Sequence, residues 1–247
     1  MKWRLIELET KNAFEAMAYE EALAESVAGG MNPTIHFWRW KPSAVSIGKF
    51  QSMEDDVDIK NCEKQGVDYI RRITGGGAVY HDYDGEITYG IVAPETILSK
   101  DITHSYKEIS EWVINGLKTI GIDAEFKPIN DIVTKGKKIS GNAQTRKNNI
   151  IVHHGTILYD VNPEKMFSLL KVNDEKIKDK LISSAKERVT SVKQNSSVGY
   201  EETYYAIKDS FLRSKEYFKG KWTDREDKRA EELIKTKYKT KEWNFER

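Results

Sequence analysis

The first clear periodicity in the chain is helical and lies near the N-terminus, in "TKNAFEAMAYEEALAESVAGG". The apolar stripe comprises Phe14, Met17, Ala18, Ala22 and Leu23, which is the spacing of one helix face. Asn12 stands where an N-cap is expected, and Glu15 follows at the interval of a capping box. Two consecutive glycines, Gly29 and Gly30, end the pattern. We therefore predict a helix over residues 12–29.

Alternating or continuously apolar runs elsewhere predict strands. These runs are "TIHFWRW" and "SAVSIGKF" around a Lys41-Pro42 turn, "VDYIRRI", "GEITYGIVA", the two halves of "DIVTKGKKISGNAQTR", and "NNIIVHHGTILYDV". Helical patterns return in "DDVDIKNCEKQG", over residues 103–121, in "NPEKMFSLLKV", and in most of the chain from about residue 191. Tight turns at Lys135-Gly136 and Asn148-Asn149 predict an antiparallel meander for the last strands.

No internal repeat, low-complexity segment or Pro/Gly-rich linker divides the sequence. A chain of 247 residues can form one large domain that buries most of its unfolded surface. We predict a single α+β domain over residues 1–247, with a mixed, largely antiparallel sheet and helices packed on it. The helical tail, about residues 191–247, is either part of this domain or a small subdomain.

Composition and charge narrow the class of protein. The net charge is +1, whereas a general nucleic-acid binder usually carries a large basic excess. The single cysteine, Cys62, excludes a disulfide framework and a cysteine-based zinc site within one chain. The N-terminus lacks a signal-peptide pattern, and no apolar run has the length of a membrane span. We expect a cytoplasmic enzyme or binding domain without nucleic-acid or membrane partners.

The stretch "YIRRITGGGAVYHDYDGEITYG" carries the strongest candidate chemistry. Gly75, Gly76 and Gly77 let the backbone approach a ligand closely and expose N–H groups to an anion. Arg71 and Arg72 precede the loop on opposite faces of a strand, and an arginine fork suits phosphate or carboxylate. The alternative is a hairpin turn with solvated arginines, but a two-residue turn rarely needs three glycines.

A second candidate site lies in "NDIVTKGKKISGNA". Strand alternation predicts that Lys138 and Ser140 share one side of the strand and that Ile139 points to the other. Lys137 is equally available from its spacing, so the residues alone do not choose between the two lysines. Gly141 suggests a close approach of backbone or ligand at this point.

Several common site types do not fit the sequence. There is no P-loop and no H-E-x-x-H pattern, and Tyr80 interrupts a dinucleotide-type glycine motif that a strand, rather than a helix, follows. "AVSIG" lacks the first glycine of a nucleophile elbow. His153 and His154 are adjacent in a strand, so they face opposite ways and cannot form a facing metal pair. We assign no catalytic transition metal.

The order of the motifs is itself informative. "RRITGGGAVYHD", "NDIVTKGKKISGNAQTR", "HHGTIL", "RVTSV" and "EWNF" follow one another along nearly the whole chain. Together they resemble the lipoate–protein ligase A family of the biotin/lipoate ligase superfamily. The resemblance implies a fold similar to class II aminoacyl-tRNA synthetase cores. It also implies a two-step reaction, in which lipoate and ATP give lipoyl-AMP and the lipoyl group then passes to a lysine of an acceptor protein.

The resemblance also implies roles for individual residues. Lys138 is implied as the catalytic lysine, and Arg72 as the arginine directed at the carboxylate and phosphate oxygens. The remaining implied ATP- and lipoate-binding residues are Gly75, Gly76, Gly77, Ala78, Val79, Tyr80, His81, Asn130, Asp131, Gly141 and His154. Asp131 is the candidate contact to Mg²⁺, and His81 and His154 are expected to support the site. The implied acceptors are E2 lipoyl domains and the glycine-cleavage H protein.

Two departures from the family pattern leave alternatives open. "YDGEITYG" is closer to the related octanoyltransferases, which form a thioester on a cysteine, but Cys62 lies in the short helix before the glycine strand. The alternatives to a ligase are therefore a lipoyl or octanoyl transferase that uses a preformed activated donor, and a non-catalytic binding module. The chain also ends soon after "EWNF", where many ligases continue into an accessory domain. We expect the catalytic subunit of a bipartite ligase with a separate accessory subunit.

Overall fold

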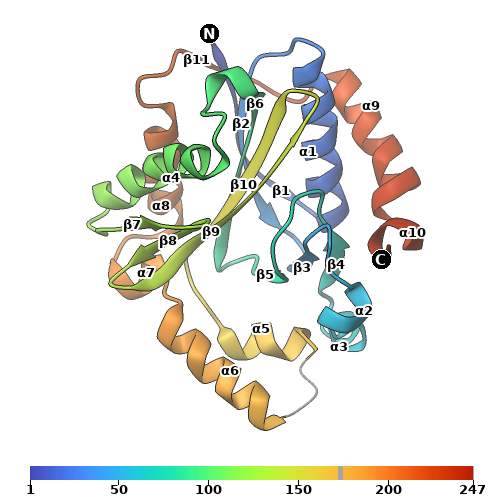
Figure 1. Cartoon of the computed structure of the whole chain (residues 1–247), viewed down its shortest axis with the longest axis vertical. Helices are drawn as coiled ribbons and strands as arrows, with labels where there is room; N and C mark the ends of the chain where they lie inside the picture. The colour runs from blue at the N-terminus through green and yellow to red at the C-terminus, as the bar shows by residue number, and fades with distance from the viewer. Residues whose placement is uncertain (172–174, 247) are drawn as a thin grey trace.

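The computed structural model of the protein describes residues 1–171 and 175–246 (Figure 1). It confirms the predicted α+β class, with a largely antiparallel sheet flanked by helices. The strands are β1 (Trp3–Lys11), β2 (Thr34–Trp40), β3 (Ala44–Ile47), β4 (Asp68–Arg71), β5 (Val79–His81), β6 (Glu86–Pro94), β7 (Glu125–Lys127), β8 (Asp131–Thr134), β9 (Lys137–Lys147), β10 (Ile150–Leu158) and β11 (Tyr217–Lys219).

Most strands belong to one large sheet. Its eight strands run in the order β11-β1-β2-β6-β10-β9-β8-β7, and a second sheet has the order β4-β3-β5. Among the described strands of the large sheet, two pairs are parallel, β11 with β1 and β1 with β2. The predicted meander is present as β8-β9-β10. Its two turns place both residues at positive φ, Lys135 at 50° and Gly136 at 76°, Asn148 at 53° and Asn149 at 59°, as tight two-residue hairpins require.

Helices cover both faces of the large sheet. They are α1 (Ala13–Ala28), α2 (Met53–Asp56), α3 (Ile59–Lys64), α4 (Ile102–Thr119), α5 (Pro163–Leu169), α6 (Glu175–Arg188), α7 (Val192–Asn195), α8 (Tyr200–Leu212), α9 (Asp224–Leu233) and α10 (Lys241–Asn244), with a 3-10 turn at Glu95–Ile97 and a π-helical turn at Ile234–Tyr238. α4 and α8 pack together on one face, and α1 and α9 pack together on the other (Figure 1). α5 and α6 lie beyond the end of the sheet (Figure 1).

Side-chain alternation in β6 divides the core from the candidate site. Ile87, Tyr89 and Ile91 point into the main apolar cluster beneath α4 and α8, because successive side chains of a strand face opposite ways. Glu86 and Thr88, which alternate with them along the strand, line a pocket on the other face. The sheet therefore carries its main apolar core on one side and the candidate site on the other.

The predicted N-terminal helix is confirmed with its caps. The Asn12 side chain accepts from the Glu15 N–H at 2.9 Å, and the Glu15 side chain accepts from the Asn12 N–H at 2.9 Å. These reciprocal bonds satisfy two helix N–H groups that otherwise lack partners. The helix ends at Gly29, its C-cap, so a local sequence signal fixed both ends.

Some elements differ from the sequence prediction. The single helix expected in "DDVDIKNCEKQG" is two short helices, α2 and α3, separated at Val57 and Asp58. The strands β1, β5, β7 and β11 were not predicted. β11 lies within the mostly helical tail and pairs with β1. Residues 172 and 247 of the predicted helical stretches lie outside the described residues. Within the described parts of the chain, no helix is long and apolar enough to cross a membrane.

Candidate active site

One pocket brings most of the predicted site residues together. It has a volume of about 300 Å³ and is bordered by the large sheet, α1, the small sheet, α5 and α6. Among the residues implied by the resemblance, its walls contain Arg72, Gly76, Gly77, Ala78, Val79, Tyr80, His81, Asn130, Lys138, Gly141 and His154. Gly75 and Asp131 do not line the pocket. Gly75 directly precedes Gly76, and Asp131 forms an ion pair with Lys138, and both of these partners line it. Segments distant in sequence thus meet in a single cavity.

The Arg72 guanidinium is buried, and each of its N–H groups has an acceptor within the chain. Nε donates to the Thr74 hydroxyl at 3.2 Å, and Nη1 donates to the carbonyl and the hydroxyl of Ser46, both at 3.1 Å. Nη2 donates to the carbonyls of Gly75 and Gly77, both at 2.8 Å. Burial lowers the pKa of Arg72 to about 10, so the side chain is still charged at neutral pH. The predicted contact of Arg72 with a ligand would require one of these bonds to be exchanged.

The glycine loop is closely packed at its centre. Gly76 has φ +100°, and a Cβ there would lie 2.8 Å from Arg72 Nη2. A Cβ at Gly48 would lie 2.1 Å from the Gly76 carbonyl oxygen. The loop therefore needs glycine both for its backbone conformation and for the close approach of its neighbours.

Arg71, the residue before Arg72, has a different set of partners. Its Nη1 donates to the carbonyls of Lys49 and Gln51, each at 2.7 Å. Its Nε and Nη2 donate to the carbonyls of Trp243 at 2.9 Å and Glu246 at 2.6 Å. Arg71 therefore ties the C-terminal segment to β4, and the two arginines point to different partners, as strand alternation predicts.

Lys138 lies across Gly141 at the edge of the pocket. Its Nζ is 2.7 Å from Asp131 Oδ1. A Cβ at Gly141 would lie 2.7 Å from both Cε and Nζ of Lys138, so the missing side chain leaves room for the lysine. The Lys137 amine instead donates to the Lys186 carbonyl at 3.2 Å. Of the two lysines, the geometry places Lys138 at the pocket.

The prediction that Ser140 shares a face with Lys138 is wrong, because β9 contains a β-bulge. Ile132 pairs with Ser140, but the next residue, Val133, pairs with Lys138, so Ile139 is an extra residue in the ladder. Ile139 and Ser140 are both fully buried, and neither lines the pocket. The bulge thus leaves Lys138 facing the site while the next two side chains face the core.

The adjacent histidines of β10 face opposite sides of the sheet, as predicted. His154 lines the pocket, with Nε2 2.8 Å from Thr74 Oγ1 and Nδ1 2.8 Å from Glu20 Oε2 of α1. His153 is fully buried on the core side, where burial lowers its pKa to about 3. His153 is therefore a neutral core residue and His154 a residue of the site.

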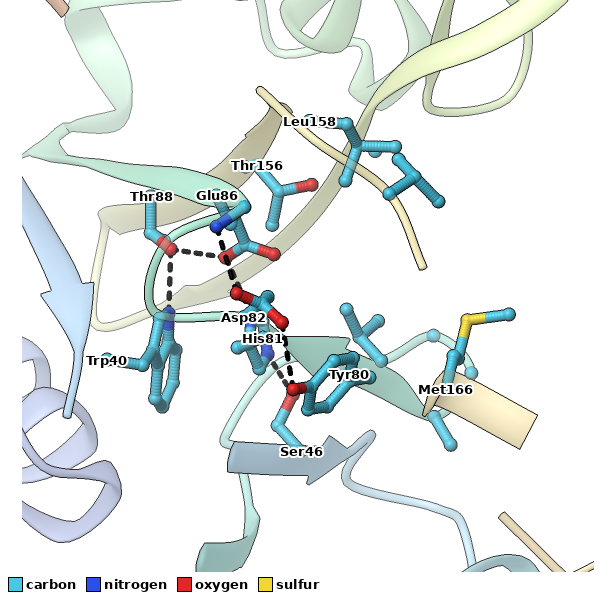
Figure 2. Close-up of a pocket in the computed structure, with 18 of the residues that line it drawn as sticks. Trp40, Ser46, Tyr80, His81, Asp82, Glu86, Thr88, Thr156, Leu158 and Met166 are labelled. Carbon is cyan, nitrogen blue, oxygen red and sulfur yellow. Dashed lines mark hydrogen bonds and ion pairs between the residues drawn. The ribbon is translucent and has the colours of Figure 1, made fainter. Parts of the chain in front are cut away.

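His81 of β5 has a similar arrangement with Ser46 and Glu86 (Figure 2). Its Nε2 is 2.8 Å from Ser46 Oγ, and its Nδ1 is 2.7 Å from Glu86 Oε1. The imidazole stacks on Trp40, with 4.1 Å between ring centroids. Thr88 also donates to Glu86 Oε1, at 2.6 Å. These contacts fix the orientation of the histidine ring.

The hydrogen-bond partners of the two site histidines had no role in the sequence prediction: Glu20, Ser46, Thr74 and Glu86. A signal existed for Glu20, which stands three residues after Met17 and three before Leu23 and so falls on the buried helix face. Ser46 interrupts an otherwise apolar strand. Nothing in the sequence linked these residues to the histidines, because that link is made only by the tertiary fold.

Cys62 lies outside the pocket, in α3. It is fully buried, and its Sγ is 3.9 Å from the Leu169 carbonyl oxygen. Burial raises the pKa of the thiol to about 11, so it is protonated at neutral pH. A protonated and inaccessible thiol is a poor nucleophile.

The donor set of the site suits a metal ion only if a substrate supplies further oxygens. In residues 1–171 and 175–246, no group of three or more His, Cys, Asp and Glu side chains lies close enough together to hold an ion. Asp131 offers one carboxylate beside the pocket, now paired with Lys138. Mg²⁺ commonly binds through one or two carboxylates together with substrate phosphates. The Asp131 contact to Mg²⁺ stays a prediction.

The family to which the sequence belongs defines the class of this protein, an enzyme that ligates or transfers acyl groups. The model of the family described as "Lipoyl protein ligase A/B catalytic domain" matches residues 12–212. The protein therefore belongs to this family, which confirms the predicted resemblance. A curated relative, the octanoyltransferase LipM of Brevibacillus brevis, is 31% identical over 276 residues, covering 100% of this chain and 99% of the relative. Several other curated relatives carry the same name.

Solved structures of ligases are also close to this protein. A structure of a bi-partite lipoate protein ligase from Thermoplasma acidophilum, studied with its E2 lipoyl domain, has a TM-score of 0.91 and 33% identity. The match covers 99% of this chain and 96% of that chain. A structure of lipoate-protein ligase A bound with ATP has a TM-score of 0.85 and 31% identity, and covers 99% of each chain.

Proposed function

We propose that this protein activates lipoate with ATP to lipoyl-AMP and transfers the lipoyl group to a specific lysine of an acceptor protein. The acceptor is an E2 lipoyl domain or a glycine-cleavage H protein. The observation that carries the proposal is that Lys138 and the glycine loop share one pocket, whereas Cys62 lies outside it. The similarity to a ligase bound with ATP supports the same conclusion.

The activation step needs positive charge more than it needs a base. A lipoate carboxylate oxygen bonds to the α-phosphorus of ATP while pyrophosphate leaves, so two anionic groups must approach each other. The carboxylate, with an ordinary pKa of about 4, is already ionised at neutral pH. Lys138 supplies an ammonium group beside the pocket, and the N–H groups of the glycine loop are donors close to it. Asp131 is the residue that would hold Mg²⁺ together with the phosphates.

The transfer step forms an amide. The acceptor lysine nitrogen bonds to the acyl carbon, AMP leaves with the electrons of the acyl–oxygen bond, and the amine loses a proton. An unperturbed lysine has a pKa of about 10.4, so deprotonation is part of the barrier. AMP leaves as a weakly basic phosphate, and the protonated acceptor lysine gives up two protons in all, one before it attacks and one as the amide forms.

The rest of the pocket suits an acyl chain. Its apolar lining includes Met17, Trp38, Leu158, Val161 and Met166. Burying a methylene group contributes about 0.8 kcal/mol, so an acyl chain with several methylene groups is bound mainly through its carbon atoms. Lipoate and octanoate share this property.

The second candidate function is lipoyl or octanoyl transfer from a preformed activated donor. The names of the curated relatives favour it. A thioester route of this kind needs a cysteine nucleophile, and the one cysteine of this chain is buried with a raised pKa. The second candidate therefore requires direct transfer from the donor to the acceptor lysine, without a covalent enzyme intermediate.

One experiment separates the two functions. The acceptor lipoyl domain is incubated with the protein and either lipoate plus ATP, lipoate alone, or octanoyl-acyl carrier protein, and is read by intact mass. We expect acylation that depends on ATP in the first mixture. Acylation from the octanoyl donor alone, together with no product from lipoate and ATP under any condition, would replace the ligase by the transferase.

We further propose that the protein is the catalytic subunit of a bipartite ligase, as the similarity to the Thermoplasma protein suggests. The same incubation is repeated with and without a candidate accessory subunit. We expect pyrophosphate release to rise strongly when the subunit is added. Full pyrophosphate release by the isolated chain would contradict this dependence.

A further inference from the structure

Two hydrogen-bond chains of the same composition reach different nitrogens of Arg72, one at Nε and one at Nη1. The first runs from Glu20 Oε2 through His154, with 2.8 Å at each nitrogen, to Thr74 Oγ1. Thr74 Oγ1 in turn accepts from Arg72 Nε at 3.2 Å. This chain thus connects α1 and β10 to Thr74, the residue before the glycine loop.

The second chain comes from β5 and β6 (Figure 2). Glu86 Oε1 is 2.7 Å from His81 Nδ1, and His81 Nε2 is 2.8 Å from Ser46 Oγ. Ser46 Oγ accepts from Arg72 Nη1 at 3.1 Å. Both chains therefore have the order carboxylate, imidazole, hydroxyl, guanidinium.

The direction of each proton follows from the guanidinium. Arginine has only donors, so the Thr74 and Ser46 hydroxyl oxygens must accept from Arg72. The hydroxyl hydrogens are then free to donate to the Nε2 atoms of His154 and His81. With a hydrogen on Nδ1, where a carboxylate accepts it, each imidazole satisfies every link of its chain.

Burial makes this network costly unless every link is made. Glu20 is 0% exposed, Glu86 1% and Arg72 5%. Buried charges are tolerated when they are hydrogen-bonded and opposed by other charges. Two carboxylates at the outer ends of the chains face one guanidinium at the centre, and such a network fixes the orientation of its members more than it adds stability.

The Arg72 guanidinium, at the centre of the network, holds the glycine loop. With Nε and Nη1 occupied by hydroxyl and strand partners, Nη2 points to the carbonyls of Gly75 and Gly77 at 2.8 Å each. Gly76 lies between these two anchors and lines the pocket. A rotation of the guanidinium would release both carbonyls together, because both are bonded to the same nitrogen.

We propose that Thr74 and Ser46 are positioning residues of the active site. Each is oriented by its own glutamate–histidine pair, and together they hold the plane of the Arg72 guanidinium. The guanidinium then fixes the glycine loop in its binding conformation before a ligand arrives. In this state Arg72 holds the loop in place, and its N–H groups are not free to bind phosphate.

The test measures the loop itself and does not depend on the acyl donor. Amide hydrogen exchange is followed in the unliganded protein for Thr74→Val, which keeps the shape of the side chain and loses the hydroxyl. We expect exchange over residues 74–78 to become about tenfold faster, as for a segment that opens locally. Thr74→Ser restores the hydroxyl and should return exchange to the parent value.

A matched control separates this effect from a general loss of stability. Thr203 in α8 is also fully buried, and its hydroxyl donates to the Gly199 carbonyl at 2.8 Å. Thr203→Val therefore removes the same group away from the site. We expect Thr203→Val to show the same amide hydrogen exchange over residues 74–78 as the parent protein, even if its melting temperature falls as much as that of Thr74→Val.

The convergence of the two chains is tested by a double-mutant cycle. Ser46→Ala cuts the second chain, and the Thr74→Val/Ser46→Ala protein lacks both. Because both hydroxyls hold one guanidinium, we expect faster loop exchange in the double variant than the product of the two single effects. Unchanged loop exchange in Thr74→Val, or independent effects in the double variant, would overturn the proposal. Failure of ATP-dependent activity would leave these exchange results intact and would bear only on the proposed function.

Discussion

Arg71 and Arg72 are neighbours in sequence, and both are buried, but they serve two different regions of the molecule. Arg71 binds main-chain carbonyls of two distant segments, residues 48–51 and 243–246. Arg72 binds two side-chain hydroxyls and the carbonyls that bracket the glycine loop. The first arginine joins pieces of the scaffold, and the second sets the shape of a pocket wall.

The two regions differ in what holds the hydrogen-bond acceptors of each arginine in place. The carbonyls that Arg71 binds lie in the turn after β3 and in the C-terminal segment, and a main-chain carbonyl cannot rotate independently of its peptide plane. The hydroxyls bonded to Arg72 can rotate, and each is held only because a histidine and a glutamate lie behind it. We therefore expect substitutions around Arg71 to change stability and those around Arg72 to change activity.

The largest effect is expected on the scaffold side. Arg71→Ala removes the donor of six carbonyls, of which those of Gly48 and Asn244 are buried and most of the others partly buried, and each buried group left unsatisfied costs about 1–3 kcal/mol. We expect the free energy of unfolding to fall by about 3–4 kcal/mol, a size that marks loss of a buried network. Chemical denaturation measures it. A protein of parent stability would show that the C-terminal segment is held by other contacts.

For Lys138→Ala we expect the activation free energy of the reaction to rise by a similar amount, without a comparable loss of stability. Loss of one aimed cationic group typically lowers the rate by about 10²–10³-fold. The lysine is partly exposed, so we expect little change in the melting temperature. Pyrophosphate release with lipoate and ATP is the measurement, and retention of the parent rate would remove Lys138 from the activation step.

Arg72→Lys compares charge with geometry. A lysine keeps the positive charge but cannot span two hydroxyls and two carbonyls, since it lacks the planar fork. We expect activity to fall by about 10–100-fold while stability falls less than in Arg71→Ala. Parent activity in Arg72→Lys would mean that only the charge at this position matters.

Gly141→Ala tests the space occupied by Lys138. The added Cβ would lie 2.7 Å from Lys138 Nζ, so the lysine must move although its charge is unchanged. We expect activity to fall about tenfold, because small displacements of a catalytic group are felt strongly. Steady-state kinetics should show the loss mainly in kcat. An unaffected kcat would show that Lys138 leaves this position when substrates bind.

The smallest effect is expected for Cys62→Ser. Because burial raises the pKa of the thiol to about 11, the thiolate is scarce at neutral pH and becomes available only as the pH rises toward that value. We expect unchanged acyl transfer and slow alkylation by iodoacetamide at neutral pH. Loss of transfer in Cys62→Ser, together with a mass shift of the enzyme by an acyl group, would support a thioester route.

Sequence reasoning succeeded where the signal is local. The capping box at Asn12, the turns at Lys135-Gly136 and Asn148-Asn149, and the opposite directions of the adjacent histidines all depend on a few neighbouring residues. The class of fold followed from the succession of such elements. Short edge strands such as β7 and β11, three residues each, gave no comparable pattern, because pairing partners rather than periodicity define them.

The site was predicted only in part, because some of its residues lie in local motifs and others are brought together only by the fold. Gly76, Gly77 and Lys138 were identified from their motifs, and they meet in one pocket. The partners of the histidines were not identified, because Glu20 is more than a hundred residues from His154. Ser140 was placed on the wrong face because strand alternation assumes a regular ladder, and an inserted residue cannot be recognised from one sequence.

The bulge in β9 has a consequence for protein engineering. Lys138 and Gly141 are three positions apart, an odd interval that an uninterrupted strand would place on opposite faces; here both line the pocket. Grafting the letters Lys-Ile-Ser-Gly into a regular strand of another scaffold would therefore turn either the lysine or the glycine away from the ligand. What must be transplanted is the bulge itself, in which residues 138–141 of β9 lie opposite residues 131–133 of β8, with one extra residue on the lysine strand.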